Sequence, residues 1–411
     1  MNKLLLILLV FIINLSFGIN EDSLLYNART PEERAQVYID ICDSLKNNKN
    51  QYLGKYSSLA LENALKSKNK QLIGISYKFE GISQADSGNY VLALKTFNKS
   101  ISYLLDVNDE VTLGAVYNNI GVTYYYQGNL QKTAENWEQA LRLYLKNNNK
   151  SSAASCYNNI GLLNNSIGNN EQALKNFKKA VPIFEELDEK VKLTHLYINI
   201  GIIEKDLGNY ESAISYLNKT IYLKKILKDE KGLSVAYNII AMVYSKQNKF
   251  ELAEEYFSMA ISLQKKHNDK TSLLSTYMNL IDFYTAQNKV NEAIKYSQIG
   301  LNLSKHEESV NNEAIFYKYL SDLYKLKNDK KNEEYYLILY TQINDSIKQY
   351  QDSLVIQSVL ENTDSLDFKN DNIDTANNVE SNFDLIIIFS VIGILIFILV
   401  VILFYKNRKL S

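Results

Sequence analysis

One pattern of apolar, small and polar positions recurs along this chain every forty residues. Seven tyrosines stand at that spacing, and a glycine or an asparagine follows each of them eleven residues later. The tyrosines are Tyr77, Tyr117, Tyr157, Tyr197, Tyr237, Tyr277 and Tyr317. Beyond these two columns, alanines and large aromatic side chains lie three and four residues apart, which is the spacing of one face of a helix. A fixed period of this length is typical of a solenoid built from repeated helical units.

The column of glycine and asparagine marks a point where a helix must end. It holds glycine in the first four units and asparagine in the last three. Because these two residue types best tolerate a left-handed backbone, the column predicts a helix carboxyl cap followed by a tight turn. In the first five units a residue no larger than alanine, such as Gly121, stands seven positions earlier, where it lets a second helix approach closely. The pattern predicts seven helix-turn-helix units over residues 71–350, with the last helix reaching about residue 360.

The second unit carries the positions of a known motif: Tyr117, Ile120, Gly121, Tyr124, Gly128, Trp137 and Ala140. In order, these are aromatic, large, small, aromatic, turn, aromatic and small residues, and the order resembles the tetratricopeptide repeat in the forty-residue form of kinesin light chains. Gln84 replaces the second aromatic residue in the first unit, and Glu333 and Tyr340 replace the alanines in the last. The resemblance implies an all-α fold, a right-handed α-solenoid of helix-turn-helix repeats whose concave face binds a protein or a peptide.

Further segments flank the repeats. The run Thr30-Pro31-Glu32-Glu33 combines a capping residue, a proline and two acids, and it predicts an irregular capping hairpin over residues 30–67. Residues 345–360 form an amphipathic stretch that could pack on the last unit or pair as a coiled coil with a second copy, giving a homodimer. Residues 361–383 are polar, and all but one of their charged residues are acidic, which predicts a disordered tether.

Both ends of the chain carry targeting signals. Residues 1–18 combine a positive start, an apolar run and a small-x-small ending, which is typical of a cleaved signal peptide; an uncleaved anchor is the alternative. Residues 385–405 contain no charge, and at ~1.5 Å per residue they reach ~31 Å, about one bilayer core. A basic tail, 406–411, follows this predicted transmembrane helix. We therefore expect a single-pass protein of the cell membrane with an exported solenoid and a cytoplasmic carboxyl terminus.

The composition argues against several kinds of site. Lys and Arg number 45 against 46 Asp and Glu, and a net charge of −1 without a basic tract gives no footprint for nucleic acid. Cys42 and Cys156 are the only cysteines and lie nearly three repeats apart, so we expect them to be unpaired. No Cys, His and carboxylate set has metal-ligand spacing, and no glycine-rich phosphate loop occurs. We expect no metal, no cofactor and no enzymatic activity.

Two columns of asparagine stand on the first helix of the middle units. Asn119 lies two residues before a small packing position, and at ~100° per residue it points ~160° away from the partner helix, toward the concave wall. A carboxamide is both donor and acceptor, so a row of them can bond the backbone of an extended peptide of any sequence. The candidates are Asn119, Asn159, Asn199 and Asn279 in one column and Asn118, Asn158 and Asn238 beside them. The resemblance implies the same role for the first three, and the alternative is that these asparagines bond to neighbouring helices within the fold.

These observations predict a membrane-anchored, extracytoplasmic scaffold that binds a protein or an extended peptide. Phe79, Ile239 and Tyr319 interrupt the first asparagine column, which restricts the predicted groove to the middle units. The alternative function is a ligand-sensing ectodomain, because the architecture resembles the exported tetratricopeptide half of bacterial membrane-anchored regulators. Only six residues follow Tyr405, so such a sensor would act through a separate cytoplasmic signalling partner.

Overall fold

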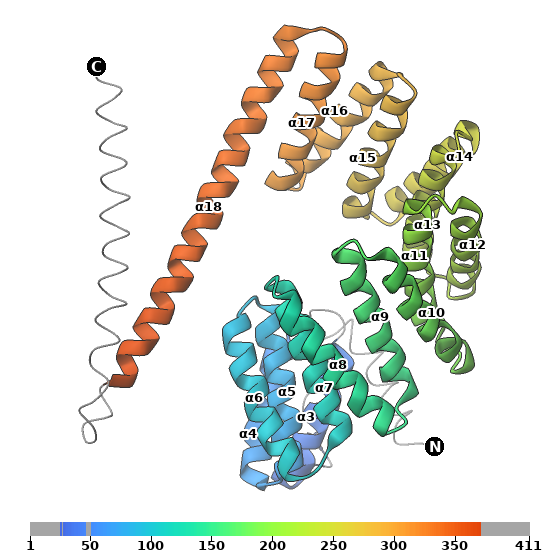
Figure 1. The fold of residues 1–411 in the computed structure, drawn as a ribbon. Helices are drawn as coiled ribbons and strands as arrows, with labels where there is room; N and C mark the ends of the chain where they lie inside the picture. The colour runs from blue at the N-terminus through green and yellow to red at the C-terminus, as the bar shows by residue number, and fades with distance from the viewer. Residues whose placement is uncertain (1–24, 27, 47–50, 371–411) are drawn as a thin grey trace, which may run out of the picture. The chain divides into compact units, whose positions relative to one another are not determined.

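The computed structural model describes residues 25–26, 28–46 and 51–370 (Figure 1). Over these residues every regular element is an α-helix, with sixteen helices, α3 to α18, and no strand. The prediction of an all-helical fold is therefore confirmed. The chain divides into two compact parts, Met1–Tyr296 and Ser297–Ser411. The predicted signal peptide, transmembrane helix and basic tail lie outside the described residues.

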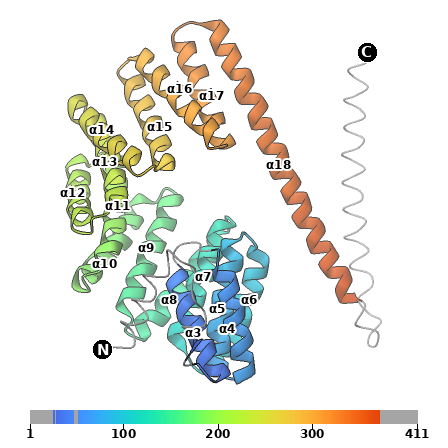
Figure 2. The ribbon, with the colours of Figure 1, turned by 180° about the vertical axis from the view of Figure 1, so that it is seen from behind.

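The amino-terminal part is a solenoid of helix pairs, which Figure 1 and Figure 2 show from opposite sides. Its first pair, α3 (Pro31–Leu45) and α4 (Leu53–Ser67), occupies the region of the predicted irregular hairpin. The following helices are each 17 residues long and begin at intervals of twenty residues. They are α5 (Lys70–Asp86), α6 (Tyr90–Asp106), α7 (Glu110–Tyr126), α8 (Leu130–Lys146), α9 (Lys150–Ser166), α10 (Asn170–Glu186), α11 (Lys190–Asp206), α12 (Tyr210–Ile226), α13 (Glu230–Lys246), α14 (Phe250–Lys266), α15 (Lys270–Ala286) and α16 (Val290–His306), of which α16 continues into the second part.

The carboxyl-terminal part contains α17 (Val310–Leu326) and α18 (Lys330–Asn370). The last helix continues beyond its predicted end at about residue 360, so residues 361–370 of the predicted tether are helical. The prediction of disorder rested on the acidic composition, which indicates only that these residues cannot form a buried core. A helix can still continue through them, because no glycine or proline lies between residues 330 and 370. Residues 371–383 of that tether lie outside the described part of the chain. Among the described helices, none is long and apolar enough to cross a membrane.

The predicted cap column is present in every unit. Its four glycines adopt φ values between 75° and 81°, and its asparagines adopt values between 56° and 59°. At the carboxyl end of α7, the N–H of Gly128 donates to the carbonyl of Tyr125 at 3.0 Å, and the N–H of Asn129 donates to the carbonyl of Tyr124 at 2.9 Å. These bonds satisfy the last carbonyls of the helix, which would otherwise lack partners.

A second left-handed column, which we did not predict, ends the second helix of each of the first six units. Its members differ in residue type but share φ values between 50° and 54°: Asn108, Asn148, Asp188, Lys228, Asn268 and Glu308. The residue that follows often caps the next helix with its side chain. Asp109, for example, accepts a hydrogen bond from the N–H of Thr112 at 3.0 Å. Each short link between units is therefore a tight turn with defined geometry.

The small column allows the close packing that the sequence predicts. A Cβ atom added at Gly121 would lie 2.5 Å from Cδ1 of Trp137, and one added at Gly81 would lie 2.6 Å from the ring of Phe97. Both aromatic rings are buried. The first helix of a unit thus presents backbone to a large ring of the second helix, and the opposite face of the first helix is left for other contacts.

Candidate functional site

The predicted asparagine columns lie on the first helices of consecutive units, all within the amino-terminal part. α7 carries Asn118 and Asn119, and α9 carries the equivalent pair forty residues later. Six of the seven side chains are partly exposed, whereas Asn238 is buried, with 7% of its surface exposed. The columns therefore lie at the surface of the solenoid for most of their length.

The two columns are joined by hydrogen bonds between adjacent units. Nδ2 of Asn159 donates to Oδ1 of Asn118 at 3.0 Å. The same bond joins Asn199 to Asn158 and Asn279 to Asn238, each at 3.2 Å. The structure therefore brings six of the seven candidates together in three pairs, and the alternative of bonding within the fold accounts for part of their hydrogen-bonding capacity.

These bonds do not use all the hydrogen-bond donors and acceptors of the carboxamides. Each group has two N–H donors and an oxygen with two lone pairs, and a cross-helix bond uses one donor on one side and one lone pair on the other. Asn118 retains both N–H groups, and Asn159 retains one. Because the bonds fix the orientation of side chains that are partly exposed, the paired columns form an ordered polar surface that can still bind a ligand.

Asn119 differs from its equivalents in having no such partner. Position 78, which would supply the acceptor, is occupied by Lys78 instead of asparagine. An ammonium group has no acceptor atom, so the bond cannot form. Among the described residues no hydrogen bond to the Asn119 side chain is present. In the preceding unit, Phe79 occupies the position equivalent to Asn119. The ammonium group of Lys78 lies 4.2 Å from the centre of the Phe79 ring.

A cleft of about 480 Å³ opens at this end of the columns. Lys46, Lys78 and Lys192 line it together with Asn118 and Asn119, and no aspartate or glutamate is among its lining residues. The lysines follow α3 or belong to α5 and α11, so the stacking of units brings them together from distant parts of the sequence. These lysines were not predicted, because they do not recur at the forty-residue period, although Lys78 stands forty residues before Asn118 and shares its register.

The three lysines differ in their partners. Lys46 pairs with Asp43, and Lys192 pairs with Glu189 and donates to Oγ of Ser151 at 2.7 Å. Lys78 has no ion pair with any described residue. Burial, followed by the nearby charge of Lys46, lowers the pKa of Lys78 to about 8.

Comparison with known families identifies the repeat. Residues 112–186 and 193–266 match the model of the tetratricopeptide repeat. The chain carries tetratricopeptide repeats. The predicted resemblance is thereby confirmed for the repeat itself, whereas the likeness to membrane-anchored regulators remains a prediction. A comparison with curated proteins finds no match.

Solved structures with similar folds agree with this assignment. Aspartyl phosphate phosphatase F from Bacillus subtilis has 20% sequence identity, with 75% of this chain and 79% of that chain covered and a TM-score of 0.53. The apo form of RapI has 17% identity, coverage of 67% and 99%, and a TM-score of 0.55. The Rap conjugation gene regulator of plasmid pLS20, in complex with the Phr* peptide, has 18% identity, coverage of 81% and 95%, and a TM-score of 0.50. At these identities the likeness shows a shared fold alone.

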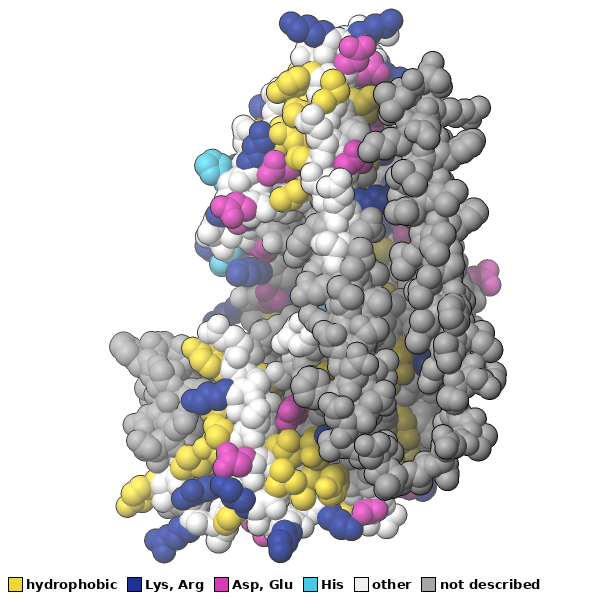
Figure 3. All heavy atoms as spheres, turned by 90° about the vertical axis from the view of Figure 1, so that its left-hand side faces the viewer, with side chains coloured by type: hydrophobic (Ala, Val, Ile, Leu, Met, Phe, Trp, Pro, Cys, Tyr) yellow, Lys and Arg dark blue, Asp and Glu magenta, His cyan; other side chains and the backbone are white. Residues whose placement is uncertain are grey.

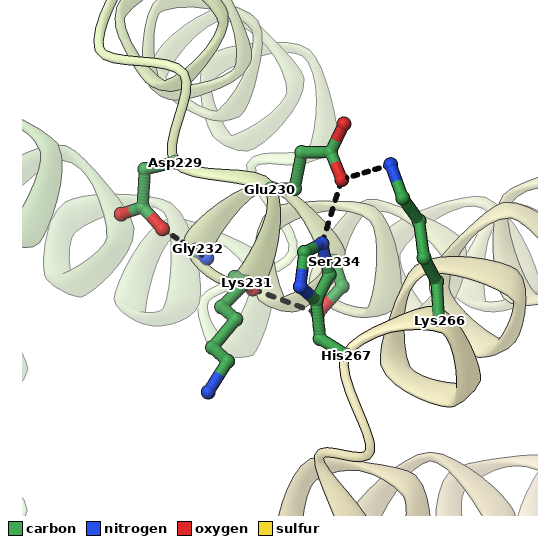
Figure 4. Close-up of polar contacts among 7 residues, drawn as sticks. All are labelled: Asp229, Glu230, Lys231, Gly232, Ser234, Lys266 and His267. Carbon is green, nitrogen blue, oxygen red and sulfur yellow. Dashed lines mark hydrogen bonds and ion pairs between the residues drawn. The ribbon is translucent and has the colours of Figure 1, made fainter.

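A further polar cluster joins the two ends of a single tetratricopeptide repeat. Oε2 of Glu230, at the start of α13, contacts the ammonium of Lys266 at 2.5 Å and Nε2 of His267 at 2.6 Å, at the end of α14 (Figure 4). Hydrogen bonds to these two residues lower the pKa of Glu230. Similar ion pairs close three other repeats: Lys70 with Asp106, Glu110 with Lys146, and Lys150 with Glu186. We interpret these exposed contacts as structural braces.

The described part of the chain also contains two cysteines and a mixture of charged and hydrophobic surface side chains. Cys42 and Cys156 are free and buried, and burial raises the pKa of each thiol to about 12, so neither is a reactive nucleophile at neutral pH. No group of three or more His, Cys, Asp or Glu in the described ranges could hold a metal ion. On the face drawn in Figure 3, basic and acidic side chains lie interspersed among hydrophobic ones.

Proposed function

We propose that the protein is a scaffold that binds a protein or an extended peptide along the asparagine columns of its tetratricopeptide repeats. The observation that supports this most directly is the ordered row of partly exposed carboxamides, which retain donors and acceptors after their mutual bonds are formed. Such a row can bond a peptide backbone without reading its sequence. The pLS20 regulator, which has a similar fold, was solved with a bound peptide.

Removing three carboxamides tests this proposal. In the full-length protein, changing Asn119, Asn159 and Asn199 together to alanine is expected to weaken binding of the partner roughly 100-fold, at about 1 kcal/mol for each lost hydrogen bond. The partner is first identified in cells with a photo-crosslinking residue in place of Ser155, which lines the cleft. The same crosslinker at the exposed Asn218, on the second helix α12, serves as the control.

The triple change also breaks two bonds within the fold, so its stability must be matched. Gln264→Ala breaks a buried hydrogen bond to Thr276, between α14 and α15 and outside both asparagine columns, and it is expected to leave binding unchanged. Circular dichroism must show that both variants are folded. If Ser155 and Asn218 crosslink to the same proteins, or if the triple variant binds the partner as tightly as the unaltered protein, the proposed surface is wrong.

We further propose that the scaffold is exported and held at the cell membrane by residues 385–405. The uncharged run of residues and the basic residues after it support this assignment. Full-length protein in isolated membranes is expected to resist extraction by alkaline carbonate and to dissolve in detergent. External protease is expected to remove the repeats from intact spheroplasts. Release by carbonate, or protection of the repeats from protease, would contradict the proposal.

A further inference from the structure

The last helix, α18, is much longer than α17, the helix that it packs against. α18 has 41 residues and α17 has 17. At ~1.5 Å per residue α18 is ~61 Å long, and a helix of the length of α17 covers only ~25 Å of it. Figure 1 shows α18 continuing well past the end of α17. Because α18 is uninterrupted from Lys330 to Asn370, residues 345–360 do not turn back onto the last unit, which leaves pairing with a second copy as the other predicted arrangement.

One row of apolar residues runs along α18 and continues past α17. Its members follow one another at alternating intervals of four and three residues, which is the spacing of a coiled-coil seam. They are Tyr336, Tyr340, Ile343, Ile347, Tyr350 and Leu354. The row begins on α17, where the rings of Tyr336 and Tyr324 stack with centres 5.6 Å apart. Residues 330–346 of α18 match the 17 residues of α17 in length, so the last three members of the row lie beyond it.

The residues on either side of this row suit the pairing of two identical helices. In a parallel coiled coil the positions that flank the seam face each other across the pair, so like charges at these positions would repel. The flanking positions here hold Asn344, Ser346, Gln351 and Ser353, all of them uncharged. The charged residues of the stretch occupy heptad positions on the opposite face and are Asp345, Lys348 and Asp352. Two copies of α18 can therefore pair without repulsion along the seam.

The part of the row beyond α17 is short. The next two positions at the same spacing hold Gln357 and Glu361, so the row ends at Leu354. A seam of this length binds weakly between molecules that diffuse freely. Two chains held in one membrane by residues 385–405 would meet at a higher effective concentration, and their α18 helices would run in the same direction.

We propose that α18 pairs in parallel with α18 of a second copy of this chain, through a seam formed by Ile347, Tyr350 and Leu354. The direction of the pair rests on the membrane anchor proposed above, whereas the pairing itself rests on the residues of α18. Such a dimer carries two sets of asparagine columns. A partner with two binding segments would therefore be held more tightly than a partner with one.

Cysteine crosslinking in isolated membranes tests this inference. Full-length protein with Ile347→Cys, or with Leu354→Cys, is expected to form a disulfide-linked dimer on mild oxidation, because facing seam positions come within the ~7 Å between Cα atoms that a disulfide can span. A dimer from each of the two variants requires a parallel pair in register, since an antiparallel pair sets at most one of these residues opposite its own copy. Lys348→Cys and Asp352→Cys, on the opposite face, are the matched controls. The two native cysteines are buried, and the unaltered protein is oxidised in parallel.

Sedimentation of the full-length protein in detergent adds a second readout. The unaltered protein is expected to have twice the mass of one chain. Combining Ile347→Asp with Leu354→Asp is expected to weaken the association roughly 100-fold, because like charges would then face each other in the seam. Gln349→Asp adds the same charge at an exposed position outside the seam and is expected to leave the mass unchanged.

The outcomes separate this inference from the proposed function. Equal crosslinking at all four positions, no dimer from the two seam variants, or a crosslink from them to another protein would each overturn the pairing. A monomer that still resists carbonate and still binds its partner would overturn the pairing alone. A protein that carbonate releases but that is dimeric in detergent would overturn the membrane anchor instead.

Discussion

Replacing Phe177 with alanine is expected to cost about 3–5 kcal/mol of unfolding free energy, the largest loss that we expect from a single change in the repeats. The ring is fully buried between α9 and α10, and it packs against Gly161, which has no side chain to obstruct it. Urea unfolding followed by circular dichroism measures the effect. Ile167 lies exposed at the carboxyl end of α9. Ile167→Ala is expected to lower the free energy of unfolding only slightly, and it controls for the loss of an apolar side chain.

The same pair of residues gives a sharper test of the packing. Gly161→Ala alone is expected to destabilise the protein by about 1–3 kcal/mol, because the new methyl group overlaps the ring of Phe177. In the Phe177→Ala background that methyl group enters the vacated space, so the two costs are expected not to add. Additive costs would show that the glycine column is small for a reason other than close approach of the ring.

Replacing Asp229 with alanine is expected to cost about 3 kcal/mol. Its carboxylate lies 2.7 Å from the ammonium of Lys224, whose side chain is only 5% exposed, and it also accepts a hydrogen bond from the N–H of Gly232. Removing it leaves a buried cation unpaired, a loss that can reach about 5 kcal/mol at a fully buried site. The partial exposure of Asp229 places the expected value at the lower end.

The neighbouring repeat supplies the control for this change. Asp269 caps α15 in the same register through the N–H of Ser272, but the position of Lys224 is occupied there by Gln264. Asp269→Ala loses only the cap, at a cost of about 1 kcal/mol. Equal losses in the two variants, measured by urea unfolding, would show that the ion pair contributes nothing.

The pH dependence of this pair has a definite sign. Partial burial alone would raise the pKa of Asp229, but hydrogen bonds from Lys224 and Gly232 outweigh it and hold that pKa below its ordinary value of 3.8. A carboxylate with a lowered pKa contributes stability that is fully present above its unfolded pKa and is lost as the pH falls through its folded pKa. Asp229→Asn, which keeps a capping oxygen, is therefore expected to lack this acid-side loss.

Much of the fold follows from residue type at a fixed period. Glycine and asparagine reveal their turns because few other residues adopt a left-handed backbone without cost. The second left-handed column was not predicted because Asp188, Lys228 and Glu308 do not usually adopt that conformation. There the surrounding contacts offset a penalty of about 1–2 kcal/mol, as where the N–H of Asp229 bonds to the carbonyl of Lys224 at 3.0 Å.

The candidate site was predictable only in part. Helical geometry placed Asn119 and its equivalents away from the partner helix, but their bonds to the second column depend on how adjacent units stack, which the spacing within one helix does not reveal. Lys78 was not predicted because it shares the register of Asn118 and Asn158 but not their residue type. The charge at this end of the columns comes from Lys78, the residue that differs from its equivalents, and not from the asparagines that repeat.

The ion pairs that close four of the repeats also bear on how the chain avoids misfolding. Nearly identical helices along one chain compete for the same partners, and a first helix could pair with the second helix of another repeat. The charges alternate over three consecutive repeats, with a lysine first in one, a glutamate first in the next and a lysine first again. Pairing α7 with α10 would set Glu110 against Glu186, and pairing α9 with α8 in this way would set Lys150 against Lys146. Contacts that add little to the stability of the folded state can therefore sort its helices during folding, by making the wrong neighbour repulsive.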